Sequence, residues 1–346
     1  MEFQKKGIVK LMIITVNKAI LHIIAPGIET SMYSQECIDI GEASVLSYII
    51  NHIEKVFEDP SIRTGEFSDN SGFKYHITEY KSGQSDFVEL SKAIAERLQE
   101  GISQSETALP SDIIVADCII HERPVLAVLK CDNKTGFTHR VVQGEGTVKN
   151  EIINHYAILP PATQKLSECA FIFLDDMTVR FKGKLVTLDG ERLNLISDVL
   201  LECDFDISVK ESFTRVEKTA KAISEEYGAD TVAADAKLKQ FIREAPVEDE
   251  ALSVTEIADA VFETAPAAKA EFTKKLKEAE VPELIEKTEY VAKRASKNIK
   301  IVTDTGIEIS FPAEYYKDEE NVSIINNDDG TISIRINNVG EILNKS

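Results

Sequence analysis

Apolar residues recur along this chain with two different periods, and the change of period divides it into regions. Up to residue 205, runs of β-branched and aliphatic residues, typical of strands, alternate with stretches that have the i, i+3, i+4 spacing of amphipathic helices. The helical spacing prevails over residues 208–298, and a period of two returns from Ile299. The pattern predicts an α+β fold: an N-terminal mixed sheet with packed amphipathic helices, then a helical array, then a C-terminal region of antiparallel β-hairpins.

Two helices and a hairpin are the clearest N-terminal elements. Residues 41–57 and 86–102 each place apolar side chains on one helical face, and Asp86 with Glu89 has the spacing of a capping box. The stretch DIIVADCIIHERPVLAVLKCD joins two apolar runs through a four-residue polar turn that contains Pro124. Such a pair predicts a hairpin near the centre of a sheet.

Weaker signals complete the N-terminal part of the chain. Further strands are expected at residues 13–24, 137–142 and 170–174. Residues 63–83 are rich in Gly, Ser and Asp, so we expect a loop there, with at most a short strand at residues 73–77.

Capping residues mark the helices of the second half. Helix starts are indicated by Ser208 with Glu211, Asp230, Ser253 with Glu256, Pro266 and Pro282, and a C-cap by Gly228. Residues 299–311 and 321–338 have the pattern of two hairpins, the second with its turn at Gly330. We therefore expect two domains: an α+β domain over residues 12–205, and a helical region ending in β-hairpins over residues 206–346.

Charge and composition narrow the class of protein. The 346 residues are 43% hydrophobic and 28% charged, and no apolar run approaches the about 18 residues that a membrane span needs. The five cysteines are widely spaced without a CxxC, which predicts reduced, mostly buried thiols in a soluble cytoplasmic protein without a membrane contact. A formal net charge of −20 disfavours non-specific coating of DNA, because phosphates repel an acidic surface. Any contact with nucleic acid must therefore be local.

No motif in the sequence indicates catalysis. QGEGTVKNE, from Gln143, approaches a phosphate loop but lacks further glycines at the required offsets, so we interpret it as a turn. The six histidines have no metal-binding spacing, and a packing role is favoured for His22 and His52, which lie in apolar segments. The sequence thus predicts no catalytic residues, no metal site and no cofactor. A metal-dependent nuclease built on Asp175 and Asp176 is the least favoured alternative.

Cations gather in KTEYVAKRASKNIK, residues 287–300, where the only acid is Glu289. On a helix that begins at Pro282, one face of about 140° would carry these cations around one aromatic side chain. The resulting candidate nucleic-acid-binding residues are Lys287, Tyr290, Lys293, Arg294, Lys297 and Lys300. Such a face suits phosphate contacts with base stacking. The alternative is an ordinary solvated face, in which i, i+4 pairs from Glu283 and Glu289 neutralise two of the lysines.

Four blocks of the sequence resemble a known family. They are NKAILHII, DFVELSKAIAERL, DIIVADCIIHERPVLAVLKCD and IEISFPAEYYKDEENVSIINNDDGTISIRINN. Their order and spacing, from Met12 onward, are similar to those of bacterial nucleoid-associated proteins of the NdpA and YejK type, most weakly over about residues 182–250. The resemblance implies a cytoplasmic protein of the nucleoid that has DNA and type II topoisomerases as partners and no catalytic residues.

Three hypotheses for function follow. The favoured one is a non-enzymatic nucleoid-associated protein that binds double-stranded DNA weakly through the face around residues 293–300, or docks on a DNA-bound protein such as a type II topoisomerase subunit. The second is an acidic interaction module that imitates DNA and does not bind it. The third is the metal-dependent nuclease. The oligomeric state is left open, with a homo-oligomer as one option.

Overall fold

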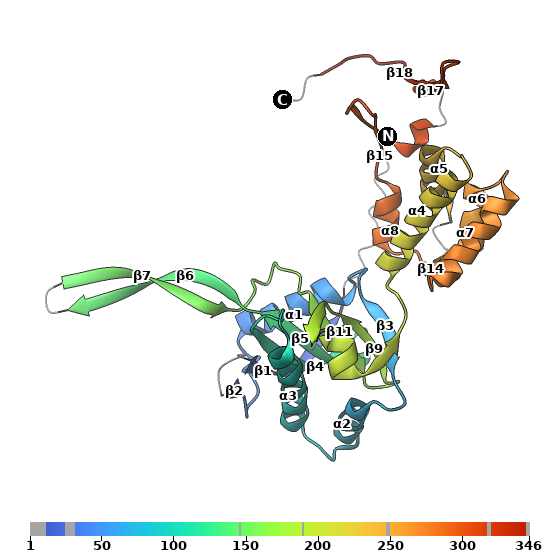
Figure 1. The fold of residues 1–346 in the computed structure, drawn as a ribbon. Coiled ribbons are helices and arrows are strands. Elements are labelled where there is room, and N and C mark those ends of the chain that lie inside the picture. Colours follow the sequence, from blue (N-terminus) through green and yellow to red (C-terminus); the bar gives the residue numbers. More distant parts are fainter. Residues whose placement is uncertain are drawn as a thin grey trace. The chain divides into compact units, whose positions relative to one another are not determined.

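The chain forms two compact units, unit 1 up to Asp206 and unit 2 from Ile207 (Figure 1). The structure, a computed structural model, describes residues 12–24, 32–144, 147–188, 190–246, 250–316 and 320–343. Among the helices of these ranges, none has both the length and the apolar character needed to cross a membrane.

One eight-stranded sheet organises unit 1, in the strand order β12-β3-β9-β8-β5-β4-β1-β2. Its strands are β1 (Ile14–Ile24), β2 (Met32–Tyr33), β3 (Arg63–Phe67), β4 (Ser111–Ile120), β5 (Arg123–Asp132), β8 (Glu168–Phe173), β9 (Thr178–Lys182) and β12 (Cys203–Phe205). The predicted α+β class is confirmed. Every pairing in the sheet is antiparallel, however, where the sequence predicts a mixed sheet.

Helices cover both faces of the sheet, which explains its continuous apolar runs. Helix α1 (Ala43–Phe57) covers one face, and the other is covered by α2 (Gly72–Ser82), α3 (Phe87–Gln104) and the π-helix η1 (Leu195–Leu201). Successive residues of β4 therefore enter different cores: Ile113 packs in the cluster of α3, and Ile114 in the cluster of α1. A strand buried on both faces loses the polar alternation of a half-exposed strand.

The central hairpin β4–β5 is confirmed, with a shorter turn than expected. Only His121 and Glu122 connect the strands, with φ of 47° and 68°, as in the two-residue turns that suit the twist of hairpins. Pro124 already pairs with Ile119 inside the sheet. The expected four-residue turn was therefore wrong.

In unit 1 the prediction of one helix is confirmed, and another helix was not predicted. The Asp86–Glu89 capping box at the start of α3 is confirmed, with both of its hydrogen bonds present. Residues 63–83, in contrast, are not a loop, because they form β3 and α2. Ser71 caps α2, and its two buried residues, Phe73 and Ile77, have i, i+4 spacing. This helical signal was obscured by the Gly and Ser residues around it.

Among the described residues of unit 1, four further strands lie outside the large sheet. They are β6 (Lys134–Gly144), β7 (Thr147–Ile158), β10 (Leu185–Leu188) and β11 (Glu191–Asn194). The strands expected at residues 137–142 and 170–174 are confirmed as parts of β6 and β8. The tip of QGEGTVKNE, residues 145–146, lies outside the described residues, and its flanks belong to β6 and β7.

Unit 2 is a helical array with small two-stranded sheets. Its helices are α4 (Val209–Glu226), α5 (Thr231–Glu244), α6 (Val254–Val261), α7 (Pro266–Glu278), α8 (Glu289–Ala295) and the 3₁₀ helix η2 (Ala313–Tyr316). Its strands are β13 (Ala251–Ser253), β14 (Leu284–Glu286), β15 (Ile299–Val302), β16 (Glu308–Phe311), β17 (Val322–Asn326) and β18 (Ile332–Ile336). The capping box of Ser208 and the caps by Asp230 and Ser253 are confirmed, as are both C-terminal hairpins.

The prediction of a helix that starts at Pro282 is wrong. Residues Leu284–Glu286 form β14 and pair with β13, and the helical segment α8 begins only at Glu289. The backbone N–H of Lys287 donates to the carbonyl of Glu250, which continues this pairing. The predicted cationic face is therefore distributed over a short helix, its flanks and a strand.

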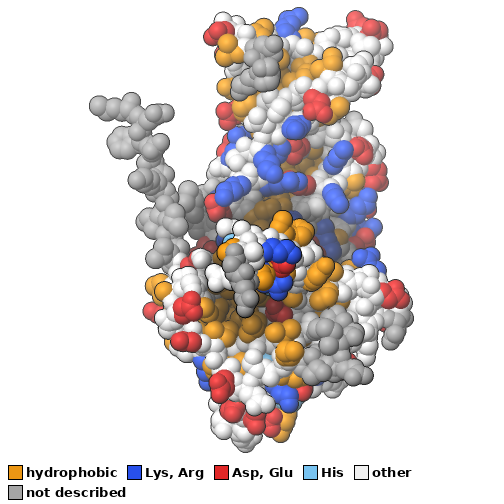
Figure 2. All heavy atoms as spheres, turned by 90° about the vertical axis from the view of Figure 1, so that its left-hand side faces the viewer, with side chains coloured by type: hydrophobic (Ala, Val, Ile, Leu, Met, Phe, Trp, Pro, Cys, Tyr) orange, Lys and Arg blue, Asp and Glu red, His pale blue; other side chains and the backbone are white. Residues whose placement is uncertain are grey.

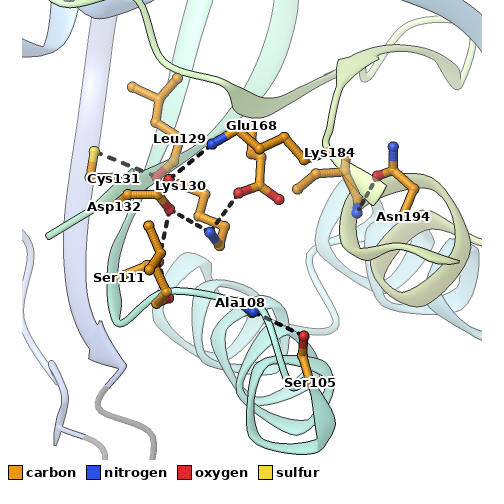
Figure 3. Close-up of polar contacts among 12 residues, drawn as sticks. Ser105, Ala108, Ser111, Leu129, Lys130, Cys131, Asp132, Glu168, Lys184 and Asn194 are labelled. Atoms are coloured by element: carbon orange, nitrogen blue, oxygen red, sulfur yellow. Dashed lines mark hydrogen bonds and ion pairs between the residues drawn. The ribbon is translucent and has the colours of Figure 1, made fainter. Parts of the chain in front are cut away.

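A buried lysine lies at one end of the hairpin β4–β5 (Figure 3). Lys130 is 2% exposed, and its Nζ lies 2.6 Å from Asp132 Oδ1 and 2.6 Å from Glu168 Oε2. Burial opposes the positive charge, but the two carboxylates outweigh it and raise the pKa of Lys130. The cluster connects β5 to β8 at the centre of the sheet.

Candidate nucleic-acid interface

A cavity of about 470 Å³ in unit 2 collects most of the cations near the expected site. It is lined by α4, α5, the last turn of α8 and the start of β15. Its cations are Lys218, Lys221, Lys239, Arg294, Lys297 and Lys300, and its acids are Glu217 and Asp235. Figure 2 shows Lys and Arg side chains gathered on one face of unit 2. The lining of the cavity thus has a net positive charge, whereas the chain as a whole has a net negative charge.

Packing determines how α8 contributes to this cavity. Val291 and Ala295 are buried in the core of unit 2, and Ile299 at the start of β15 is buried in a neighbouring cluster. These contacts hold the segment between them against α4 and α5. Lys297 and Lys300 flank the buried Ile299 and remain exposed at the cavity.

Of the six predicted residues, three do not line the cavity. Lys287 donates from Nζ to the carbonyls of Ala245 and Pro246, at 2.8 and 2.7 Å. Lys293 forms an exposed pair with Glu289, with 2.7 Å between Nζ and Oε1. Tyr290 packs against the core of unit 2. Lys293 therefore forms the i, i+4 pair that the solvated-face alternative expects, whereas Lys287 contacts two distant backbone carbonyls in place of Glu283.

Arg294 lines the cavity with its charge already paired. Its Nε and Nη2 lie 3.0 and 2.8 Å from the two carboxylate oxygens of Glu217 on α4, an arrangement with the fork geometry of a strong ion pair. The hydrogen bonds that Arg294 donates to Glu217 raise the pKa of Arg294. We conclude that Arg294 joins α8 to α4 and offers little net charge to a ligand.

Two further lysines of the cavity also have carboxylate partners. Lys239 is 8% exposed, and its Nζ lies 2.8 Å from Asp235 Oδ2 one helical turn away. Lys221 lies 3.8 Å from Glu225, and both side chains are more than half exposed, so solvent and salt weaken this pair. Lys221 therefore keeps much of its charge for another contact.

Three exposed lysines of the cavity are unpaired. Within the described part of the chain, the ammonium groups of Lys218, Lys297 and Lys300 form no ion pair or hydrogen bond. Thr231 and Asn298 add polar side chains to the same lining. Unpaired ammonium groups around a polar cavity suit an anionic ligand, above all phosphate oxygens.

The sequence predicted three of the six cations of this lining, Arg294, Lys297 and Lys300. Lys297 and Lys300 were found because no acid follows Glu289 before the end of the segment. Lys218 and Lys221 were missed, since on α4 they stand among Glu residues and resemble an ordinary solvated face. Only the packing of α4 against α8 brings the two groups together.

The other polar candidates have structural partners. Arg123 donates to both Asp175 oxygens at 2.7 Å and to Asp176 at 2.6 Å, and the hydrogen bonds from Arg123 lower the pKa of Asp175 to about 2. Within the described residues, no group of three or more His, Cys, Asp or Glu side chains is placed to hold a metal ion. The acidic pair thus serves as an ion-pair partner of Arg123.

His22 has the packing role that its apolar strand predicts. It is fully buried, its Nδ1 accepts from the backbone of Ser34 at 3.2 Å, and its Nε2 lies 3.0 Å from Ser91 Oγ. Burial lowers the pKa of His22 to about 4, so the ring is neutral at physiological pH. The five cysteines are free thiols, and all but Cys37 are buried.

Comparisons with known proteins complete the description of the chain. A search of the curated proteins gives no match. A family model described as nucleoid-associated protein YejK matches residues 20–344, nearly the whole chain, and confirms the resemblance seen in the sequence. The chain belongs to the nucleoid-associated protein family represented by YejK.

Proposed function

We propose that this chain performs its nucleoid-associated role by a direct, weak contact with DNA phosphates, made by the cavity of unit 2. The observation that carries the proposal is the set of unpaired, exposed lysines, Lys218, Lys297 and Lys300, around one cavity. They come from α4 and from the segment after α8, so they present several ammonium groups to a strand of phosphates. The role needs no catalytic step.

The expected strength of the contact follows from its charge. Three or four lysines neutralise few phosphates, and the net charge of −20 of the chain as a whole repels the duplex. Affinity is therefore weak and falls steeply with salt. The side chains offer no planar fork for base edges, so binding is independent of DNA sequence.

Charge reversal tests the proposal. We expect Lys297→Glu with Lys300→Glu to weaken binding of a labelled DNA duplex by about tenfold or more at low salt, measured by fluorescence anisotropy. Lys274→Glu with Lys277→Glu on α7 is the matched control, because it makes the same change of charge on exposed residues away from the cavity. Equal affinities of the two double variants would refute a local contact.

A second candidate is docking on a DNA-bound protein such as a type II topoisomerase subunit. The acidic surface favours it, since a net charge of −20 suits a basic partner. A pull-down from bacterial lysate separates the two routes. Partners that survive nuclease treatment, and that the double variant Lys297→Glu/Lys300→Glu retains, support docking; loss of all partners after nuclease contradicts it.

A further inference from the structure

Strands β6 and β7 form a ribbon of their own in unit 1. They pair with each other over 11 and 12 residues as a separate two-stranded sheet, and Figure 1 shows them leaving the large sheet as a long ribbon. At about 3.3 Å per residue the ribbon spans roughly 40 Å. An isolated ribbon of two strands is marginally stable in water unless one of its faces is covered.

The register places most of the large exposed apolar side chains of this ribbon on one face, with Val142 and Ile153 on the other. Phe137 is opposite Asn154, Ile152 opposite His139, and each second residue along a strand shares a face. The apolar residues of this face and their exposed fractions are Phe137 76%, Val141 51%, Val148 67%, Ile152 81% and Tyr156 73%. We call it the apolar face of the ribbon.

Charged side chains occupy only the opposite face. Between residues 137 and 156, the charged residues that the structure describes are Arg140, Lys149 and Glu151, and the register places all three opposite the apolar face. Glu151 forms ion pairs with Arg140 at 2.6 Å and with Lys149 at 3.0 Å, so the charged side chains of this second face are paired with one another. The apolar face has His139, Gln143, Asn150 and Asn154 between its large side chains.

We propose that the apolar face of the β6–β7 ribbon is the contact through which two copies of this chain associate. A second copy of a chain with net charge −20 is repelled at most surfaces, and among the residues that the structure describes this face carries no Asp, Glu, Lys or Arg. Its carboxamides both donate and accept hydrogen bonds, so the face is complementary to itself, as a two-fold interface requires.

The size of the face agrees with a dimer contact. Its five large apolar side chains expose several hundred Å², the order of the about 800 Å² that each partner contributes to a stable interface. Two ribbons packed face to face would make a four-stranded sandwich and bury these side chains in its core. A β-ribbon can also enter a DNA groove, but the apolar face has no Lys or Arg for phosphates.

The test is the oligomeric state of the full chain. We expect sedimentation equilibrium at micromolar concentration to give twice the chain mass of 38.4 kDa. Ile152→Asp would place one unpaired carboxylate from each copy in the contact and raise the dissociation constant by about tenfold or more. Val142→Asp, on the opposite face of the same ribbon, is the matched control and should leave association unchanged.

Salt gives a second measurement that depends on no variant. Because two acidic copies repel each other, raising the salt concentration should strengthen their association, whereas it weakens contact with DNA. A monomeric wild-type chain, a dimer that Ile152→Asp leaves intact, or equal effects of the two substitutions would overturn the proposal. So would loss of DNA binding in Ile152→Asp without any change in mass.

Discussion

Lys130 is a charged residue enclosed almost completely by the sheet of unit 1. Its two carboxylate partners, Asp132 and Glu168, each lie 2.6 Å from its Nζ, and Ser111 Oγ lies 3.2 Å from Asp132. An ion removed from water costs several kcal/mol, which only close partners of opposite charge offset. The stability of unit 1 therefore depends on the complete cluster.

Removing this lysine should destabilise the chain strongly. Lys130→Met removes the charge that faces the buried carboxylate of Glu168 and leaves Asp132 with Lys184 at 3.5 Å, and we expect a loss of about 3–5 kcal/mol in the free energy of unfolding. Urea denaturation measures it. Lys92→Met, on α3, removes a 52% exposed lysine and should cost less than about 0.5 kcal/mol.

The same variant gives a pH dependence with a defined sign. Burial opposes ionisation of Asp132, but the lysine charges, above all Lys130, outweigh it and lower the pKa of this carboxyl, so the stability that the pair contributes is present above the ordinary pKa of about 4 and is lost as the pH falls through the folded-state value. The deficit of Lys130→Met against wild type should therefore be full at about pH 7 and shrink as the pH falls below about 4. An identical deficit at about pH 3 and pH 7 would show that the charge of Asp132 contributes nothing to it.

At the residue scale, the sequence predicts a site residue when its charge is uncompensated locally. Lys297 and Lys300 lie in a stretch without acids between Glu289 and Asp304, and they are unpaired in the described structure. The pairing of Arg294 could not be predicted in this way, because its partner Glu217 is 77 residues distant in sequence. The spacing of residues along the sequence reveals only those ion-pair partners that are a few residues apart.

At the element scale, helices with strong caps were predictable and short strands were not. The caps of α3, α4 and α5 consist of residues within one turn of each other, so they are visible in the sequence. Strand β14 has three residues and depends on pairing with β13 across the intervening helices. Its apolar residues fit a helix equally well, and the tertiary pairing decides between the two.

Gly65 lies where β3 and the edge strand β12 of the large sheet approach each other closely. A Cβ on Gly65 would lie 2.2 Å from the backbone oxygen of Asp204, so Gly65→Ala should force β3 and β12 apart and cost about 2 kcal/mol. Thermal or urea unfolding measures the loss. Gly72→Ala is the control, since its Cβ would meet nothing closer than 3.7 Å at the first turn of α2, and it should be neutral or slightly stabilising. If both variants were neutral, this crowding would have no energetic importance.

At the scale of the whole molecule, the distribution of charge matters more than its sum. The net charge of −20 predicts repulsion from DNA, and the cavity of unit 2 is a local exception because two distant segments bring their cations together. The sequence predicts the α+β class and the helical array, since both depend on periodicity. It does not predict the long ribbon, because the second strand of the ribbon begins inside QGEGTVKNE, which has the composition of a turn.

Whether the cavity of unit 2 contacts DNA phosphates is decided by the salt dependence of DNA affinity. Each phosphate contact contributes a slope of about −0.9 in log K against log salt concentration. If Lys218, Lys297 and Lys300 each contact a phosphate, replacing all three by Gln should make the slope shallower by about 2.7. A slope identical to that of the wild-type chain would contradict direct phosphate contact by this cavity.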